Sequence, residues 1–445
     1  MGTRISPLHQ FANALEGIAM TSDASDLERL SLDYYWYSPV LFEQLQHKRG
    51  ELVVFPETEQ AVMQIAAAAA KYRVKLTIRG GGTGNYGQCI PLEGGVIVDV
   101  KRLNKVIALE PGWMRVEAGI LIDDADQSAR QQQQELLMWP STKRTATLGG
   151  FIAGGYAGVG SIRHGILKDP GNVRMIRVVT VEITPRIIEL RGADIQKVHH
   201  AFGTNGIITQ VEVALTPAQP WLHHISLFEG YDKVLNFGVA ASRPDMDLKL
   251  LTSVDQRFAQ FFDEIPQYFP ATHDAMFAIV NESALKDYEA LAARFGGVRS
   301  LCDSEENLDA KGLPPAYECA YNHTTLRALA KDRSYTYLQI AYPQPFDATL
   351  VLTQMQRWGE EMYQHHEFAK QYGGYVLFGL PLLNYFDKPR LYEIMAEFEA
   401  DGCTVFDPHV YTIEDGGMKQ IDHAQIDFKR IADPMGLMNP GKTRA

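Results

Sequence analysis

The sequence lacks several features that would mark whole classes of protein. Its four cysteines (Cys89, Cys302, Cys319 and Cys403) lie far apart and form no C-x-x-C pair, which excludes the usual zinc and iron–sulfur spacings. No run of about 18 apolar residues occurs, which argues against a membrane-spanning helix. The net charge of −12 argues against nucleic acid as a partner.

Signals for export are also missing from the start of the chain. Residues 1–20 have no continuous apolar core and include Glu16, so we expect no signal peptide. Together with the unpaired cysteines, this favours a reduced cytoplasm. The composition is otherwise ordinary, with 445 residues, 46% hydrophobic and 22% charged, which suits two or three domains with sizeable cores.

Glycine is abundant in one early stretch. Five of the nine residues at 79–87 are glycine, and residues 74–78 before them read as a short buried strand. The bare backbone N–H groups of such a loop can converge on an anion, typically a pyrophosphate. The alternative is a surface turn, which five glycines beside Arg79 and Thr83 suit poorly.

The residues after the glycines distinguish between the known types of phosphate-binding loop. Residues 82–87 match G-x-G-x-x-G, but the dinucleotide fingerprint also needs a helix opening at the glycines. Instead Pro91 and two more glycines follow, and then a predicted strand at 96–100. An ordinary Rossmann unit is therefore excluded. The Walker pattern fails as well, because no Gly-Lys-Ser/Thr follows.

The elements around this loop predict two α/β units in the first 140 residues. A strand at 53–56 precedes an alanine-rich helix at 61–71, with Thr58 as a plausible N-cap. After the loop, a strand at 115–119 precedes a helix at 121–137. The glycine loop lies between the two units.

A second stretch of small residues covers 145–161. It predicts a helix packed tightly against a ligand or another backbone. A close helix–helix contact would also explain its glycines, but not why it follows the first stretch by about 70 residues. The next predicted elements are a hairpin at 178–182 and 187–190, a helix at 195–202 and a strand at 207–215.

Two prolines in five residues at 216–220 indicate a domain boundary. Beyond it, residues 221–420 alternate strands with helices, which predicts an α+β domain with an antiparallel sheet. The predicted strands are 226–228, 275–280, 335–340 and 374–378. The predicted helices are 285–295, 348–364 and 389–399.

Seven ordered motifs carry a resemblance to a known family. They are Pro56, R-G-G-G-T-G at 79–84, V-E-A-G at 116–119, A-T-L-G-G at 146–150, R-H-G at 163–165, G-I-I-T at 206–209, and the tail 428–442. This order resembles the vanillyl-alcohol oxidase / p-cresol methylhydroxylase type of FAD-binding oxidoreductases. The tail is similar to the K-x-x-x-D-P-x-G-x-x-N-P-G-K ending of the glycolate oxidase/D-lactate dehydrogenase branch.

The resemblance implies an α+β fold with a bipartite FAD-binding domain of two α/β subdomains and an α+β cap domain with an antiparallel sheet. On this basis residues 1–217 are the FAD-binding domain, including an arm at 1–50. Residues 221–420 are the cap, or substrate, domain. Residues 425–445 are a C-terminal return to the FAD domain.

The resemblance also implies the cofactor site. Loop 79–84 would bind the pyrophosphate, Ile207 would lie near the adenine, and Asn439 would approach the flavin. The implied FAD-binding residues are Arg79, Gly80, Gly81, Gly82, Thr83, Gly84, Asn85, Pro140, Thr147, Gly149, Gly150, Ala153, Ser161, Gly206, Ile207 and Asn439. Some members attach FAD through a histidine in the first loop. This loop has none, so we expect non-covalent FAD.

The chemistry implied is oxidation of a small alcohol, 2-hydroxy acid or lactone, with hydride passing to flavin N5 while a base takes the hydroxyl proton. His409 is the first candidate base and His323 the second, although a lone histidine is more often structural. Thr324 or Thr325 beside His323 could instead cap a helix. The metal-binding H-x-x-G-D-G-N-x-H pattern of the hydroxy-acid branch is absent. We therefore expect no metal, and the pattern gives no support to an acid substrate.

Arg163 or Arg327 could clamp a substrate carboxylate, although a surface salt bridge is the commoner role. The alternatives to an FAD-linked oxidase or dehydrogenase are a flavoprotein subunit of a larger complex, a non-enzymatic FAD fold and a nicotinamide protein. The expected partner is a small-molecule substrate. The electron acceptor and a homo-oligomeric state stay open.

Overall fold

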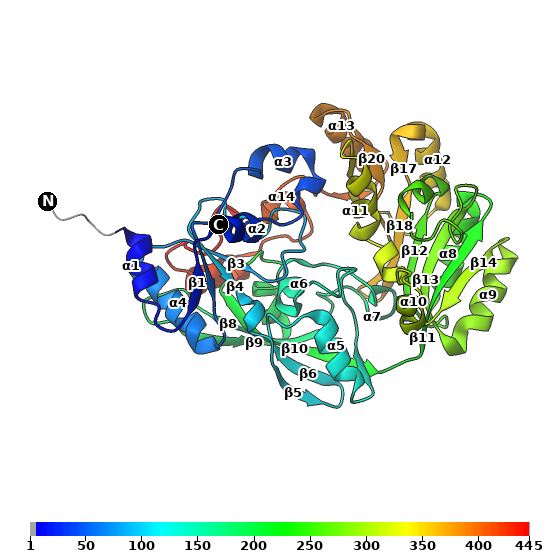
Figure 1. Ribbon diagram of the computed structural model, residues 1–445. Helices are drawn as coiled ribbons and strands as arrows, with labels where there is room; N and C mark the ends of the chain where they lie inside the picture. Colours follow the sequence, from blue (N-terminus) through cyan, green and yellow to red (C-terminus); the bar gives the residue numbers. More distant parts are fainter. Residues whose placement is uncertain (1–5, 445) are drawn as a thin grey trace.

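The computed structural model describes residues 6–444. Figure 1 shows two adjoining parts, one holding strands β1–β10 and the C-terminal segment, the other holding β11–β21. Within residues 6–444, no helix is both long enough and apolar enough to cross a lipid bilayer.

The first sheet is small and mostly parallel. Its order is β1 (Ala19–Thr21), β2 (Leu52–Phe55), β4 (Val96–Asp99) and β3 (Leu76–Arg79). β1 pairs antiparallel with β2, while β2, β4 and β3 run parallel. Helix α4 (Glu59–Tyr72) connects β2 to β3, and Thr58 Oγ1 accepts a hydrogen bond of 3.1 Å from Ala61 N. The predicted helix and its N-cap are therefore confirmed.

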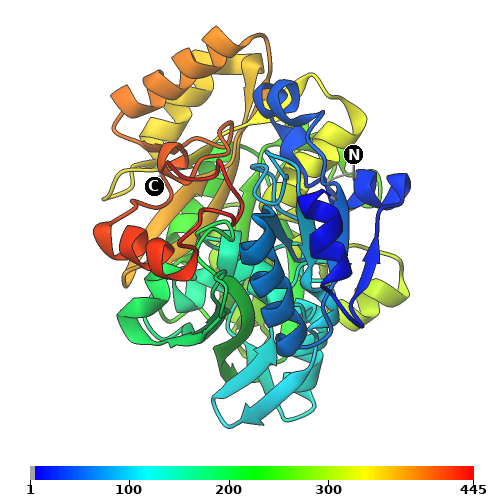
Figure 2. The same cartoon turned by 90° about the vertical axis from the view of Figure 1, so that its left-hand side faces the viewer.

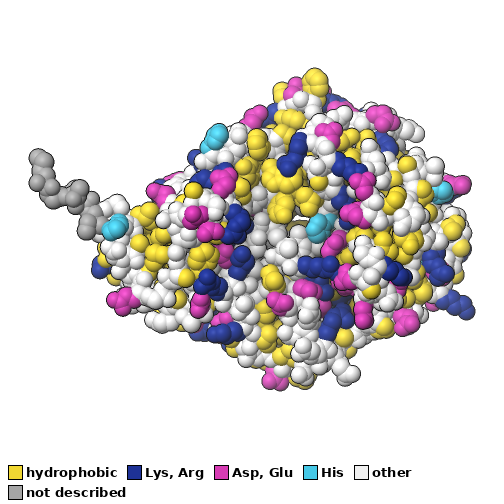
Figure 3. Space-filling model, viewed as in Figure 1, with side chains coloured by type: hydrophobic (Ala, Val, Ile, Leu, Met, Phe, Trp, Pro, Cys, Tyr) yellow, Lys and Arg dark blue, Asp and Glu magenta, His cyan; other side chains and the backbone are white. Residues whose placement is uncertain are grey.

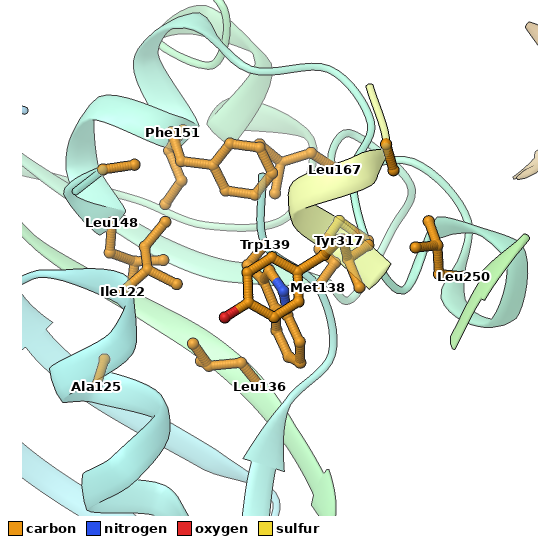
Figure 4. Close-up of a cluster of buried hydrophobic side chains, with 14 of the residues drawn as sticks. Ile122, Ala125, Leu136, Met138, Trp139, Leu148, Phe151, Leu167, Leu250 and Tyr317 are labelled. Carbon is orange, nitrogen blue, oxygen red and sulfur yellow. The ribbon is translucent and has the colours of Figure 1, made fainter. Parts of the chain in front are cut away.

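The second sheet is antiparallel. Its order is β5 (Val106–Glu110), β6 (Trp113–Glu117), β10 (Ile207–Pro217), β8 (Val173–Val179) and β9 (Ile187–Leu190), with β7 (Gln134–Leu136) also pairing β10. Helices α5 (Ile122–Arg130) and α6 (Leu148–Gly154) contribute to its core, where Ile122, Leu148 and Phe151 lie near Trp139 (Figure 4). The predicted hairpin is confirmed by the pairing of β8 with β9.

Two predicted helices in this part are wrong in extent. The helix expected at 121–137 ends at Arg130, because Gln133 takes a positive φ of 56° and the chain then joins β10 as β7. The helix expected at 195–202 is only the 3₁₀ turn Gly192–Lys197. His200 and Phe202 both have a φ of 49°, which a right-handed helix does not allow.

The third and largest sheet draws every strand from residue 221 onward. Its order is β14 (Val298–Asp303), β11 (Trp221–Phe228), β13 (Asp274–Asn281), β12 (Leu248–Val254), β18 (His365–Gln371), β19 (Gly374–Gly379), β16 (Gln339–Ala341) and β21 (Thr404–Phe406). All of its pairs are antiparallel. A small sheet of β15 (Tyr335–Tyr337), β20 (Leu382–Asn384) and β17 (Met362–Tyr363) lies beside it.

The helices of this part are α8 (Tyr231–Ala241), α9 (Leu285–Arg294), α10 (Glu305–Ala310), α11 (Asn322–Lys331), α12 (Ala348–Trp358) and α13 (Lys388–Ala400). The helix expected at 348–364 stops at Trp358, because Gly359 has a φ of 48° and the chain continues into β17. The strand expected at 335–340 is split between two sheets, as β15 and β16.

The N-terminal arm and the C-terminal tail both reach the first sheet, the arm through β1 and the tail through residues 437–439. The arm forms α1 (Pro7–Asn13), α2 (Ala24–Leu30) and α3 (Pro39–Leu45), and the tail forms α14 (Ile413–Gly416) and α15 (His423–Ala432). Leu76 N donates to Leu437 O at 2.8 Å, and Asn439 N donates to Leu76 O at 2.6 Å, so the tail lies beside β3. In Figure 2 the arm (blue) and the tail (red) both face the viewer.

Candidate functional site

A cavity of about 260 Å³ lies where the glycine stretches of the first part meet the third sheet and α11. The expected FAD residues in its wall are Gly80, Gly81, Gly82, Thr83, Gly84, Asn85, Pro140, Thr147, Gly149, Gly150, Ala153 and Gly206. Arg79, Ser161, Ile207 and Asn439 are not in the wall, although each is buried close to a residue that is.

Arg79 supports the first glycine loop from behind. Its Nη1 donates a hydrogen bond to Leu32 O and contacts Cys89 Sγ at 3.4 Å. Gly82 has a φ of 65°, and a Cβ there would overlap the Arg79 guanidinium. The loop therefore needs glycine at this position for conformation and for space.

The two glycine stretches pack directly on each other. A Cβ on Gly80 would overlap Thr147 Oγ1, and one on Gly81 would overlap the carbonyl oxygen of Thr145. Gly149 is equally close to Ala118, whose Cβ would lie 2.6 Å away. This close packing leaves backbone rather than side chains in the cavity wall. Such a wall fits the pyrophosphate and ribityl chain of an FAD molecule.

Three expected residues stabilise the wall without lining it. Asn439 Nδ2 donates to Gln88 O at 2.7 Å and to Phe202 O at 2.5 Å, which links the tail to the first loop. Its Oδ1 is buried without a hydrogen-bond partner. Ser161 Oγ accepts from Gly158 N at 2.9 Å, and Ile207 lies in the core of the first sheet.

A buried charged cluster at the cavity was missed by sequence reasoning. Asp33, from the arm, and Cys89, after the loop, both line the cavity, while Lys442 from the tail is fully buried beside them. Burial raises the pKa of Asp33 above its ordinary range, and the positive charges of Lys442 and Arg79 oppose this shift. Burial likewise lowers the pKa of Lys442. The residues meet only through the fold, so no local pattern could have paired them.

Residues in or next to the third sheet and α11, together with Met418 of the tail, form the opposite wall, called here the cap wall. It consists of Tyr321, Asn322, Gln339, Ile340, Phe378, Gly379, Leu380, Phe406 and Met418. The first loop reaches across to it, because Tyr86 Oη donates to Gln339 Oε1 at 2.7 Å. Asn85 Nδ2 also donates to Tyr337 Oη at 2.7 Å. The glycine loop is thus held by the strands that face it.

Tyr321 has an unusual backbone conformation in the cap wall. Its φ of 49° and ψ of −141° are rare for a non-glycine residue. Tyr321 N donates to Glu367 Oε1 at 2.6 Å, and Tyr321 Oη donates to Gly158 O at 2.7 Å, so both ends of the residue are fixed. Strained residues of this kind concentrate at functional sites.

The capping role considered for Thr324 or Thr325 is wrong. Both residues are buried inside α11, which begins at Asn322, and Thr324 Oγ1 donates to Cys319 O at 3.0 Å. Tyr321 occupies the N-cap position and makes no side-chain cap hydrogen bond.

The structure places both candidate bases away from the cavity wall. His409 is 1% exposed, with Nδ1 2.8 Å from Ser38 Oγ and Nε2 3.0 Å from Tyr337 O. Burial lowers the pKa of His409 to about 3 and that of His323 to about 4. Both ring nitrogens of His409 are engaged by the protein, so its geometry suits a structural link better than proton transfer to a substrate.

The two candidate carboxylate clamps are engaged elsewhere. Arg163 forms an ion pair with Asp247, and Arg327 forms one with Glu264 at 2.6 Å; neither lines the cavity. Among residues 6–444, no group of three or more His, Cys, Asp or Glu side chains is placed to hold a metal ion.

The cavity lies between glycine-rich backbone on one side and a separate antiparallel sheet on the other. Residues 50–182 match the family described as "FAD binding domain". This part of the chain is therefore an FAD-binding domain, and FAD is its cofactor. The expected FAD-binding domain is confirmed over these residues, and so is FAD as the cofactor.

Curated relatives share only parts of the sequence. D-2-hydroxyglutarate dehydrogenase of Escherichia coli (strain K12) is 40% identical over 125 residues, which are 27% of this chain and 12% of that protein. D-lactate dehydrogenase of Anaerostipes hadrus is 27% identical over 184 residues, 38% of this chain and 37% of that protein. Glycolate oxidase subunit GlcD of Escherichia coli (strain K12) is 27% identical over 200 residues, which are 43% of this chain and 39% of that protein. The matches thus span less than half of each relative.

Solved structures match the fold over almost the whole chain. An alkyldihydroxyacetonephosphate synthase has a TM-score of 0.72 at 15% identity, covering 97% of this chain and 85% of that one. The 4-ethylphenol oxidase of Gulosibacter chungangensis has a TM-score of 0.67 at 16% identity, covering 98% and 96%. These likenesses confirm the expected fold class.

Proposed function

We propose that the protein is an FAD-linked oxidase or dehydrogenase that oxidises a small hydroxyl-bearing molecule. The observation that carries the proposal is one continuous cavity, which runs from the glycine-rich backbone to the cap wall of polar and aromatic side chains. The relatives named as 2-hydroxy-acid dehydrogenases and oxidases support the reaction class. Bound FAD would supply the hydride acceptor at N5.

The chain's own residues would divide the work between the two walls. We assign residues 6–217 and 425–443 to the flavin side, because their backbone N–H groups and glycines suit the phosphates and ribityl chain. We assign residues 221–420 to the substrate side. The hydrogen bond between Tyr86 Oη and Gln339 Oε1 would hold the walls in register, as the geometry of hydride transfer requires.

Asp33, which lines the cavity from the flavin side, is the proposed proton acceptor for the substrate hydroxyl group. Among the described residues that line the cavity, it is the one carboxylate, and none of them is a histidine. Its raised pKa moves the group toward neutral pH, where a general base is most effective. Lys442 and Arg79 would balance the charge of the carboxylate before it takes the proton.

The proposal is tested with the purified, FAD-loaded protein. Under anaerobic conditions a substrate should bleach the visible flavin absorbance, and turnover should then be sustained by either oxygen or a dye acceptor. The substrate panel pairs alcohols, 2-hydroxy acids and lactones of similar size. A protein that keeps its FAD but is bleached by no member of the panel would count against the enzymatic function.

We further propose that the FAD is not covalently attached. Loop 79–87 has no histidine, although Cys89 lines the cavity and is the side chain that could form a bond. Burial raises the pKa of the Cys89 thiol to about 12, which disfavours the reactive thiolate. Acid precipitation should release all the flavin from both the parent and Cys89→Ser. Flavin retained in the parent pellet, and lost in Cys89→Ser, would show a bond to Cys89.

A further inference from the structure

The cap wall carries no cationic side chain. Its polar members are Tyr321, Asn322 and Gln339, and the rest is aliphatic, aromatic or glycine. Among all the described residues that line the cavity there is no lysine, arginine or histidine, and Asp33 is the only carboxylate. We infer that the substrate is an uncharged alcohol with an apolar or aromatic body, rather than a hydroxy acid. This inference rests on the proposed function and names its substrate class.

A carboxylate in this cavity would lack the partner that it usually has. Burying an unpaired carboxylate costs several kcal/mol, and proteins commonly offset that cost with an arginine or lysine. The nearby basic side chains are already engaged. Arg79 binds Leu32 O and Cys89, Lys442 donates to Gly87 O, and Lys419 donates to Gln196 O at 2.6 Å.

Backbone N–H groups do not replace the missing cation at the cap wall. On the glycine side, bare N–H groups are the features that suit the FAD phosphates. On the cap side, Ile340 pairs with Gly379 in the β16–β19 ladder. Leu380 N donates to His365 O at 2.8 Å, and Tyr321 N donates to Glu367 Oε1 at 2.6 Å.

The start of α11 would attract an anion if it were free, but Glu367 already occupies it. This carboxylate is fully buried. Its Oε1 accepts a hydrogen bond of 2.6 Å from Tyr321 N and lies 2.9 Å from His365 Nε2. Negative charge at a helix N-terminus offsets the helix dipole. Glu367 behind the cap wall and Asp33 in the opposite wall would therefore both disfavour a substrate carboxylate.

The remaining wall suits an apolar body with a hydroxyl group. The ring centroid of Tyr156 is 6.1 Å from that of Phe378 and 5.8 Å from that of Phe406, and all three rings line the cavity. Aromatic groups pack well in such surroundings. The amides of Asn322 and Gln339 can donate to and accept from a neutral hydroxyl group.

The test compares compounds that differ only in the carboxylate. The FAD-loaded protein is titrated with 1-phenylethanol and with mandelate, each as both enantiomers, and the rate of anaerobic flavin bleaching is measured. Binding is measured separately, through the change in the flavin spectrum, with the oxidised analogues acetophenone and benzoylformate. We expect the neutral member of each pair to be preferred by about tenfold or more, since like-charge proximity costs at least 1.4 kcal/mol.

The two readouts separate this inference from the proposed function. Absence of bleaching by every compound, with acetophenone still bound more tightly than benzoylformate, would count against the function and support the neutral site. Equal or tighter binding of benzoylformate, or no binding of acetophenone, would overturn the inference.

A charge introduced into the cap wall provides the matched variant. Gln339→Lys should shift the preference toward mandelate and benzoylformate by about tenfold or more. Gln356→Lys makes the same change on the exposed face of α12 and should leave the preference of the parent unchanged. If Gln339→Lys does not fold, Asn322→Lys replaces it. An unchanged preference in a folded, FAD-loaded cap-wall variant would overturn the inference.

Discussion

Gly82 combines a positive φ of 65° with a neighbour that leaves no room for a side chain. We expect Gly82→Ala to strain the loop or to displace Arg79, at a cost of about 1–3 kcal/mol in the free energy of FAD binding. This cost corresponds to a loss of roughly 5- to 150-fold in FAD affinity. The measurement is a titration of the FAD-free protein with FAD, followed by flavin fluorescence.

Gly312 provides a matched control for this substitution. Its φ of 66° is nearly the same, but a Cβ there would have nothing within 4 Å. Gly312→Ala should cost similar backbone strain and leave FAD affinity near that of the parent. If both variants bind FAD equally well, the first loop is an ordinary turn at Gly82 and does not hold the cofactor.

Asp33 and His409 can be distinguished by their effects on turnover. Asp33→Asn should keep FAD but lower kcat/KM by about 10²- to 10⁴-fold, because the proton acceptor is lost. His409→Gln should lower stability while changing kcat/KM by less than about tenfold, because its contacts are structural. The reverse ranking, measured on FAD-loaded variants, would restore His409 as the base.

At the scale of the elements, two helix caps differ in what else their side chains contact. Thr58 caps α4 at an exposed position, whereas Ser38 caps α3 through a 3.1 Å bond from Leu41 N and also binds His409 at 2.8 Å. Thr58→Ala should cost about 1 kcal/mol. Ser38→Ala should cost that amount plus about 1–3 kcal/mol, because it leaves a buried His409 nitrogen unpaired.

Urea unfolding at a fixed FAD concentration measures both costs. A Ser38→Ala variant no less stable than Thr58→Ala would show that the Ser38–His409 contact adds nothing. Because β15 supplies Tyr337 O to the same histidine, the larger loss should also make the arm easier to cleave by protease.

The elements that the sequence predicts best are those encoded locally. The apolar runs of β2 and β4 and the alanine-rich α4 with Thr58 agree with the structure, since period, burial and cap indicate the same element. The helix expected at 121–137 failed because β7 finds partners in β10, about 80 residues away. Such a ladder is invisible to a window of local residues.

Residues of the candidate site likewise fall into those that the sequence predicts and those that it does not. The glycine stretches were predictable, because glycine is required where backbone must approach another backbone or a phosphate. Asp33, Lys442 and the cap wall were not, since they meet only after the arm, the tail and the third sheet have folded together. His409 and His323 were predicted as bases because of the chemistry of the imidazole ring. Their role depends on burial, and burial cannot be predicted from a single residue in the sequence.

At the scale of the whole molecule, most charged side chains are dispersed over the surface and a few are buried. On the face shown in Figure 3, acidic and basic side chains are interspersed around a central hollow. Inside, Lys249 and Glu135 form a fully buried pair at 2.8 Å that joins the two parts of Figure 1. Removing one member of such a pair typically costs about 3–5 kcal/mol, so the relative position of the two walls depends on buried polar groups.

The buried histidines make the whole molecule sensitive to acid. Burial lowers the pKa of His200 and His223 to about 4, and that of His366 and His409 to about 3. The ordinary value is about 6.5, so the unfolded chain binds these protons first as the pH falls. Their contribution to stability is complete above pH of about 6.5 and is lost progressively as the pH falls toward 4, by up to about 1.4 kcal/mol per histidine per pH unit.

Five carboxyl groups act in the opposite direction, because burial raises the pKa values of Asp33, Asp274, Glu318, Asp407 and Asp433. Burial raises the pKa of Asp33 and Asp274 to about 6, so the folded protein binds those protons first and gains stability on acidification. Burial lowers the pKa of eight histidines in all, which outnumber these carboxyl groups, and we expect the urea midpoint of the FAD-loaded protein to fall between pH 6.5 and pH 5. His223→Asn can still accept the hydrogen bond from Ala316 N and should flatten this decline, whereas His47→Asn, at an exposed position, should follow the parent. A decline of equal slope in all three proteins would mean that His223 is not held neutral by burial.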